Sequence, residues 1–332
     1  MSVSNRQPKI LWVVPELLDE DGRVQESPTA ILISEVTKLG AIVDVVTFTT
    51  KKSLSISSEL AAQLGVTNSV VFHRSHLPRM PFARMCLFLG QSLILPKMPA
   101  PYLPFYSKRI VQAFEALFDG RVRKLKELGV SGEYSEINPD WDLVLYDGLE
   151  GSAHLFDGKR ITLSEQMPPV LYRAPLVEAD RWRGNANESS GTLYANYNAT
   201  QAELIKEFEL ALLRKVTAVL SPSDRAAARF REALPRIQQH ILPTAYRFSE
   251  APLERTPVPG RFLSVIDFNI PGERGAVRWF LTEVWPEVVE RAPERELVLV
   301  GKGSQKGLSR FRRLSGLTII PWESVPTEEY LQ

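Results

Sequence analysis

The chain has 332 residues, of which 44% are hydrophobic and 24% are charged, as in an ordinary soluble globular protein of about two domains. Its 40 basic and 39 acidic residues give a net charge of +1, which excludes a global field that would draw the chain to nucleic acid. A single cysteine, Cys86, excludes an internal disulfide framework and a cysteine-based zinc site.

The N-terminus favours a cytoplasmic protein. It runs directly into an apolar segment at residues 10–14, with no apolar signal core ahead of it. No apolar run approaches the roughly 20 residues that a membrane-spanning helix needs. One cysteine also suits a reducing compartment. The sequence therefore predicts a cytoplasmic location.

The first part of the chain alternates strand-type runs with helical periodicity. The predicted strands are residues 10–14, 42–48, 70–73, 143–146, 170–173, 218–220 and 239–242. The predicted helices are residues 30–39, 107–128, 200–215 and 224–234, the last capped by Ser223. This alternation is typical of an α/β, Rossmann-type doubly wound parallel sheet, which we expect over residues 1–248.

Residues 249–260 are the predicted linker, because they contain Pro252, Pro257 and Pro259 and little apolar content. Residues 261–332 then begin a second Rossmann-type domain, with strands predicted at 262–266 and 297–300 and an amphipathic helix between them. The turn Gly301-Lys302-Gly303 places backbone N–H groups and a cation at the carboxyl end of a parallel sheet. Phosphate-bearing ligands favour that location.

Candidate catalytic groups follow the predicted strand at residues 143–146. Asp147 and Glu150 come at its end, and His154 lies on the next helix. Two carboxylates and an imidazole near a strand end can position or deprotonate a hydroxyl group. The alternative interpretation is that Asp147 and Glu150 cap the helix N-terminus, where negative charge is favourable.

The segment at residues 261–300, RFLSVIDFNIPGERGAVRWFLTEVWPEVVERAPERELVLV, resembles the start of the C-terminal domain of GT-B glycosyltransferases of family 4. Members of that family often read SLDWxPNxxAVRWFxxEVWPxI here, and the WF, EVWP and VGKG elements match. Residues 317–330, LTIIPWESVPTEEY, resemble the next strand of the family and the segment after it. The Gly-rich loop and acidic helix that hold the donor come later in the family, so we expect a partial, donor-side second domain.

The resemblance implies retaining transfer of a sugar from a nucleotide-diphosphate sugar to a saccharide or lipid-linked acceptor, with no metal or cofactor. Residues 171–182, LYRAPLVEADRW, resemble the family's YRAHNVEADRW, which places them on the acceptor side. The expected site residues are Asp147, Glu150 and His154 for catalysis, Gly22, Arg23, Arg173, Glu178 and Trp182 for the acceptor, and Arg274, Gly301 and Lys302 for the donor.

Departures from the family pattern favour a second interpretation, a non-catalytic saccharide-binding relative or accessory subunit. Pro175-Leu176 replaces a His-Asn pair, Gly22 stands where a Gly-Gly turn is usual, and Pro243-Thr244-Ala245 replaces Pro-Asn-Gly. Simpler alternatives also stand for single residues: a structural salt bridge between Arg173 and Glu178, and a surface position on a helix N-terminus for Arg274.

Two surfaces predict partners. Residues 73–109 mix cations with large apolar side chains, which suits either a lipid surface at the inner membrane or helices that pack on the sheet and expose their cations. In the partial second domain, apolar faces around Trp279, Phe280 and Trp285 would be poorly covered. We therefore expect protein association through the C-terminal region.

Overall fold

The structure is a computed structural model that describes residues 6–17, 24, 27–50, 63–74, 86, 97–157, 159–164, 166–188, 191–247, 258–268, 270–303 and 308–321. The chain divides into two units: Met1–Arg181 with Ala199–Arg247, and Trp182–Asn198 with Phe248–Gln332. The short segment Trp182–Asn198 thus groups with the C-terminal unit rather than with its sequence neighbours.

The first unit is built on a sheet whose strand order is β4-β3-β2-β1-β5-β6-β7-β8. All of these strands run parallel except β4, which pairs antiparallel with β3. Their bounds are β1 Lys9–Val14, β2 Ile42–Thr49, β3 Asn68–His73, β4 Ser131–Glu133, β5 Leu143–Asp147, β6 Val170–Arg173, β7 Ala218–Ser221 and β8 Gln238–Ile241. The predicted doubly wound parallel sheet is confirmed, because the strand order reverses direction between β1 and β5.

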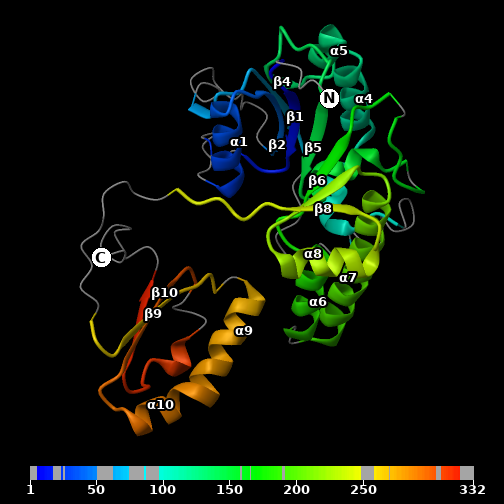
Figure 1. The fold of residues 1–332 in the computed structure, drawn as a ribbon. Helices are drawn as coiled ribbons and strands as arrows, with labels where there is room; N and C mark the ends of the chain where they lie inside the picture. Colours follow the sequence, from blue (N-terminus) through cyan, green and yellow to red (C-terminus); the bar gives the residue numbers. More distant parts are fainter. Residues whose placement is uncertain are drawn as a thin grey trace. The chain divides into compact units, whose positions relative to one another are not determined.

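Helices cover both faces of this sheet (Figure 1). One face packs Trp12, Val45 and Leu145 against Ile33 of α1. The other face carries an aromatic cluster in which Phe72 of β3 meets Phe114 of α4 at a ring-centroid distance of 4.7 Å. The helices of the first unit are α1 Pro28–Lys38, η1 Ala100–Phe105, α4 Lys108–Phe118, α5 Val122–Glu127, η2 Glu150–Leu155 and α8 Asp224–Ala233. Two more, α6 Glu178–Glu188 and α7 Thr192–Leu213, lie partly in this unit and partly in the segment Trp182–Asn198, which groups with the second.

The single helix predicted over residues 107–128 is wrong, because it breaks into α4 and α5. Gly120, with φ +65°, adopts the left-handed conformation that L side chains rarely take. Asp119 caps α4 through its backbone N–H, and Arg121 begins the next turn. A glycine inside the predicted helix therefore separates two helices.

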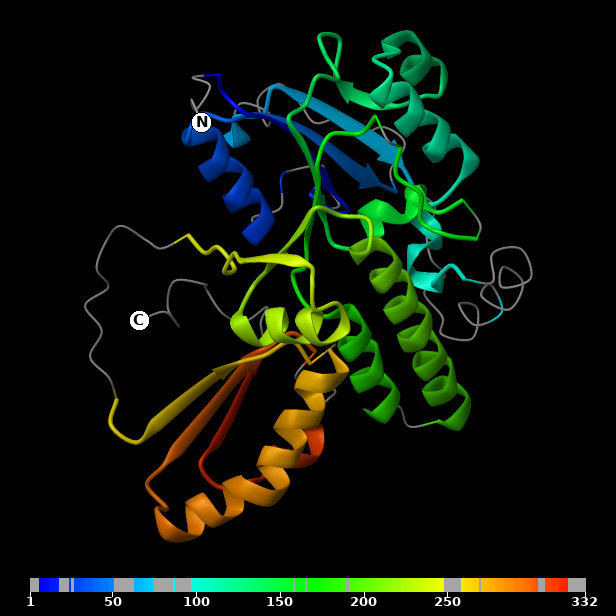
Figure 2. The same ribbon diagram turned by 45° about the vertical axis from the view of Figure 1, so that its right-hand side comes forward.

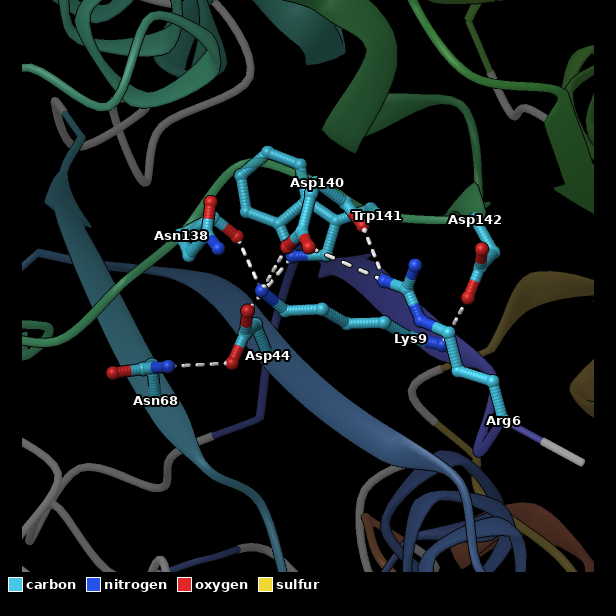
Figure 3. A network of polar contacts seen from close by, with 8 residues as sticks. All are labelled: Arg6, Lys9, Asp44, Asn68, Asn138, Asp140, Trp141 and Asp142. Atoms are coloured by element: carbon cyan, nitrogen blue, oxygen red, sulfur yellow. Dashed lines mark hydrogen bonds and ion pairs between the residues drawn. The ribbon is translucent and has the colours of Figure 1, made fainter.

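A polar network ties the loop before β5 to the amino ends of the central strands (Figure 3). Lys9 Nζ donates to Asp140 Oδ1 at 2.7 Å, and the Lys9 backbone N–H donates to Asp142 Oδ2 at 2.7 Å. Behind them, buried Asp44 accepts bonds of 2.7 Å from both Trp141 Nε1 and Asn68 Nδ2. These contacts fix β5 beside β1 at the edge opposite to the candidate site.

The second unit contains a parallel sheet in the order β11-β10-β9 with one helical run along it (Figures 1 and 2). Its elements are β9 Arg261–Val265, α9 Pro271–Trp279, η3 Phe280–Val284, α10 Trp285–Arg291, β10 Glu296–Gly301, η4 Ser309–Phe311 and β11 Leu317–Pro321. Pro286 has no backbone N–H to donate within the helical run. Just before it, the backbone N–H of Trp285 donates to Phe280 O and closes a π-helical turn.

The core of the second unit lies on one side of this small sheet. Leu281, Trp285, Leu299 and Phe268 are nearly fully buried there, and Trp285 Nε1 donates to Ser315 O at 3.0 Å. The expected exposure of apolar side chains holds for Trp279, which is 61% exposed, but not for Trp285, which is 1% exposed.

Within the described residues, β9 forms a free edge of the small sheet. Phe262, Leu263 and Val265 are 51%, 49% and 58% exposed, respectively. An open apolar groove of about 640 Å³ runs between these strand residues and the helical run. In the large sheet the equivalent first strand, β1, has neighbours on both sides.

Candidate functional site at the carboxyl edge of the large sheet

Asp147 and Arg173 are the last residues of β5 and β6 and pair in register across the two parallel strands. Beyond them Gly148, with φ +78°, turns the chain, and its N–H donates to Arg173 O at 2.9 Å. Residues with a side chain rarely adopt a positive φ, so a glycine at this position allows the turn. The two charged side chains therefore meet where ligands collect in open α/β sheets.

A buried ion pair forms at this point. Arg173 Nη1 donates to both carboxylate oxygens of Asp147, at 2.7 and 2.8 Å. Thr29 of α1 accepts from Arg173 Nη1 at 3.1 Å and donates to Asp147 Oδ2 at 2.9 Å. Both charged side chains are about 95% buried, so each charge is stabilised by its partner in place of water.

The alternative salt bridge between Arg173 and Glu178 does not form. Arg173 pairs with Asp147, and Glu178 pairs with Arg181 one helical turn away at 2.5 Å. Asp147 does not cap the following helix either, because its oxygens accept from Arg173 and Thr29.

Glu150 and Glu178 are the first residues of the helices that follow two neighbouring strands, β5 and β6. Glu150 begins η2, and its Oε2 would lie 2.9 Å from a Cβ added at Gly148. Desolvation by burial, followed by the charge of Glu178, raises the pKa of Glu150 to about 7. Burial also raises the pKa of Glu178, although Arg181 opposes the shift. This pair can hold a proton near neutral pH, as a general acid or base must.

Glu209 is a further buried carboxyl group near this pair, and it was not found from the sequence. Glu209 of α7 accepts a hydrogen bond of 3.0 Å from the Tyr172 hydroxyl, and burial raises its pKa to about 8. Tyr102 is fully buried nearby, and burial raises its pKa well above the usual value, with further contributions from Glu150, Glu178 and Glu209. Glu209 lies mid-helix, so only its place in the amphipathic pattern of α7 could have indicated burial.

His154 has a structural environment. Its Nδ1 lies 2.9 Å from Gly151 O, to which it can only donate, so Nε2 accepts the Tyr146 hydroxyl at 3.1 Å. The ring stacks on Phe114 at 3.4 Å, and burial lowers its pKa to about 3. Because Tyr146 precedes Asp147 on β5, its side chain points to the opposite face of the sheet. The structure therefore keeps the imidazole apart from the Asp147–Arg173 pair.

The loops after β6 and β7 border a groove of about 600 Å³. Pro175 and Leu176 form part of its wall, at the positions that differ from the family pattern. Three cations, Arg181, Arg225 and Arg229, also border it, and Arg229 pairs with Asp180 at 3.2 Å. Arg225 and Arg229 were not found from the sequence, although both lie on the helix that follows β7. Trp182 follows Arg181 on α6.

Gly22 and Arg23 lie outside the described residues. The part of that loop which the structure does describe ends in Ser27, whose hydroxyl accepts from Ala30 N and caps α1. Thr29 therefore reaches the Asp147–Arg173 pair from a well-defined helix start.

The expected donor residues lie after β9 and at the end of β10, on the carboxyl side of these two strands. Gly301 ends β10, and a Cβ there would lie 1.8 Å from Ile266 O, so glycine permits close contact between the loops after β9 and β10. The Phe268 N–H donates to Lys302 O at 2.9 Å in the same contact. Arg274 lies in the first turn of α9. Lys302 is exposed and Arg274 half-buried.

Among the described residues, no group of three or more histidine, cysteine, aspartate or glutamate side chains could hold a metal ion. In the same part of the chain, no helix has the length and apolar character to cross a bilayer.

No protein-family model and no curated protein sequence matches this chain. Solved structures do match it. The crystal structure of TarM aligns with 98% of this chain and 78% of its own, at 9% identity and a TM-score of 0.53. A point mutant of S. aureus TarM, in complex with fondaparinux, α-GlcNAc-glycerol and UDP, aligns with 97% of this chain and 79% of its own, at 10% identity and a TM-score of 0.51.

This chain has a GT-B fold. The match extends over nearly the whole chain, so the large sheet and the three-stranded sheet correspond to the two Rossmann-type parts of that fold. At such low identity the likeness establishes the fold and not the reaction.

Proposed function

We propose that this protein is a glycosyltransferase that moves a sugar from a nucleotide-diphosphate sugar to a hydroxyl group of a saccharide or lipid-linked acceptor. The observation that carries the proposal is the carboxyl edge of the large sheet in a GT-B fold. There a buried Asp147–Arg173 pair adjoins Glu150, whose pKa is raised to about 7. A proton acceptor of that pKa suits an alcohol nucleophile at neutral pH.

In this proposal the acceptor hydroxyl loses its proton to Glu150 as its oxygen forms the new bond to the sugar's anomeric carbon. The bond from that carbon to the diphosphate breaks on the same face of the sugar, so the nucleotide diphosphate leaves and the configuration is retained. Arg274, Gly301 and Lys302 would hold the diphosphate, through cations and backbone N–H groups at a strand end. Asp147 fixes Arg173 beside the acceptor. We propose retention of configuration, no metal and a cytoplasmic setting.

The second candidate is a non-catalytic saccharide-binding or accessory subunit. Its support is the apolar wall that Pro175 and Leu176 give to the groove after β6, where polar side chains would be expected to contact an acceptor. The buried, paired state of His154 also leaves one fewer polar group at the edge.

Transfer from a panel of radiolabelled UDP-, GDP- and dTDP-sugars tests the two candidates. With an active donor, Glu150→Gln should lower kcat by about 10²-fold or more, whereas Glu136→Gln at an exposed position should leave it unchanged. Saccharide binding without turnover of any donor would favour the accessory subunit. Full activity of the folded Glu150→Gln variant would remove Glu150 from the reaction.

A further inference from the structure

A separate cationic pocket of about 370 Å³ lies away from the carboxyl edge, in the large unit. It is bordered by the loop that follows η2, by one stripe of α7 and by Lys97 just before η1. Its volume falls within the range of small-molecule sites. None of its lining residues belongs to the transfer site described above.

The floor of this pocket is apolar and fixed by the core. Phe156 and Phe208 are 4% and 3% exposed, and their ring centroids are 6.1 Å apart. Ile161, which is 2% exposed, forms a β-bridge with Phe156. The floor therefore keeps its shape without a ligand, and offers an apolar surface under the rim.

The rim carries four cations, Lys97, Lys159, Arg160 and Arg214. Within the described part of the chain, Arg160 is the only one of them with an acidic partner, Asp157, at a long 3.5 Å. Asp157 Oδ1 also accepts the backbone N–H groups of Lys159 and Arg160 at 2.9 Å each, which fixes the turn that bears these two cations.

Arg214 directly follows the last residue of α7, seven residues after Glu207, and its N–H still donates to Leu210 O at 3.2 Å, as in a helix. Among the described residues that line the pocket or pair with its cations, Glu207 and Asp157 are the acidic ones, so two carboxylates stand against four cations. The local excess of positive charge contrasts with the chain's net charge of +1. Such an excess at one concave, partly apolar position attracts an anion.

We propose that this pocket binds a phosphate ester joined to an apolar group. The guanidinium groups of Arg160 and Arg214 match phosphate oxygens with paired, charge-assisted hydrogen bonds, and Lys97 and Lys159 add point charges. The Phe156, Ile161 and Phe208 floor contacts the apolar group and excludes water. The ester can come from an anionic lipid head group in a bilayer or from a water-soluble molecule.

Vesicle sedimentation tests the bilayer source. The full chain should bind vesicles of phosphatidylglycerol and phosphatidylcholine more tightly than vesicles of phosphatidylcholine alone, and more salt should weaken the binding. Combining Lys159→Ala, Arg160→Ala and Arg214→Ala should weaken binding about a hundredfold, from about fivefold for each cation. The control combines Arg123→Ala, Lys126→Ala and Arg236→Ala, which removes three exposed cations elsewhere.

Calorimetric titration with hexyl phosphate and with inorganic phosphate tests the soluble source. Hexyl phosphate should bind the native chain more tightly than inorganic phosphate does. Only the pocket variant, which combines Lys159→Ala, Arg160→Ala and Arg214→Ala, should lose hexyl phosphate binding. Loss of either vesicle or hexyl phosphate binding in the pocket variant alone supports the site and identifies the source. The proposal would be overturned if the pocket variant and the control variant, with unchanged thermal midpoints, bound vesicles and hexyl phosphate equally well. Equal affinity of the native chain for hexyl phosphate and inorganic phosphate would also overturn it.

Discussion

Arg173 is a buried cation whose partner comes from the neighbouring strand, and this makes Asp147 important for stability as well as position. Asp147→Ala would leave the guanidinium buried without its counter-charge. We expect that change to lower the free energy of unfolding by about 3–5 kcal/mol, measured by urea denaturation.

The matched comparison is Asp180→Ala, which breaks the exposed pair with Arg229. That change should cost about 1 kcal/mol or less, because water screens an exposed pair. Similar small costs for Asp147→Ala and Asp180→Ala would show that the Asp147–Arg173 pair is not buried as described.

Glu209 predicts how stability depends on pH. Burial raises its pKa from 4.5 to about 8, so between these values the folded chain keeps a proton that the unfolded chain releases. Rising pH therefore favours unfolding over that window, and the contribution becomes constant above about pH 8. The thermal midpoint should fall from pH 5 to pH 8 in the native chain, and less in Glu209→Gln.

Glu136→Gln serves as the control, because Glu136 is exposed. Its thermal midpoint should follow that of the native chain across the same pH range. An identical slope for Glu209→Gln and the native chain would contradict a protonated Glu209.

At the scale of elements, Gly120 directly follows the C-cap of α4, and Gly184 lies within α6. Gly120 has φ +65°, and an added Cβ would lie 3.2 Å from Pro139 Cδ, so Gly120→Ala should destabilise the fold by roughly 1–2 kcal/mol. At Gly184 an added Cβ meets no atom within 4 Å, so Gly184→Ala should stabilise by about 0.5–1 kcal/mol. Urea denaturation measures the free energy of unfolding of both variants. A change of the same sign in both would contradict the backbone conformations described for Gly120 and Gly184.

The sequence predicted these parallel strands because most of their residues form apolar runs, as at residues 143–146 and 170–172. It missed β4, Ser131–Glu133, whose strand state depends on pairing with β3 rather than on its own residues. It also missed the first turns of α7, because the segment from Thr192 onward contains polar residues with no apolar stripe.

From the sequence, contacts in the candidate site could be predicted only between residues at the ends of neighbouring strands. Asp147 and Arg173 end two apolar runs, so neighbouring parallel strands bring them together. Thr29 and Glu209 come from helices whose orientation the sequence pattern does not fix, and their contacts required the folded structure. His154 satisfied the sequence pattern for catalysis, but its ring packs into an aromatic core.

At the scale of the whole molecule, the free edge that β9 forms within the described residues predicts association. An edge strand with exposed Phe262, Leu263 and Val265 pairs readily with another chain. Sedimentation equilibrium should give an average mass that rises with concentration. Val265→Lys should restore a monomer, whereas Tyr246→Lys, which also replaces an exposed apolar side chain, should not. A monomer at all concentrations would contradict association through this edge.

The polar network at the amino ends of the central strands has a consequence for the order of folding. Lys9 meets Asp140 and Asp142 across more than 130 residues, whereas β9, β10 and β11 pair within a short stretch of chain. Distant pairings form slowly, since a long loop must close first. Amides of β10 should therefore gain protection before those of β5 in pulse-labelled hydrogen exchange during refolding. A nascent chain cannot pair β1 with β5 until the ribosome has released both strands.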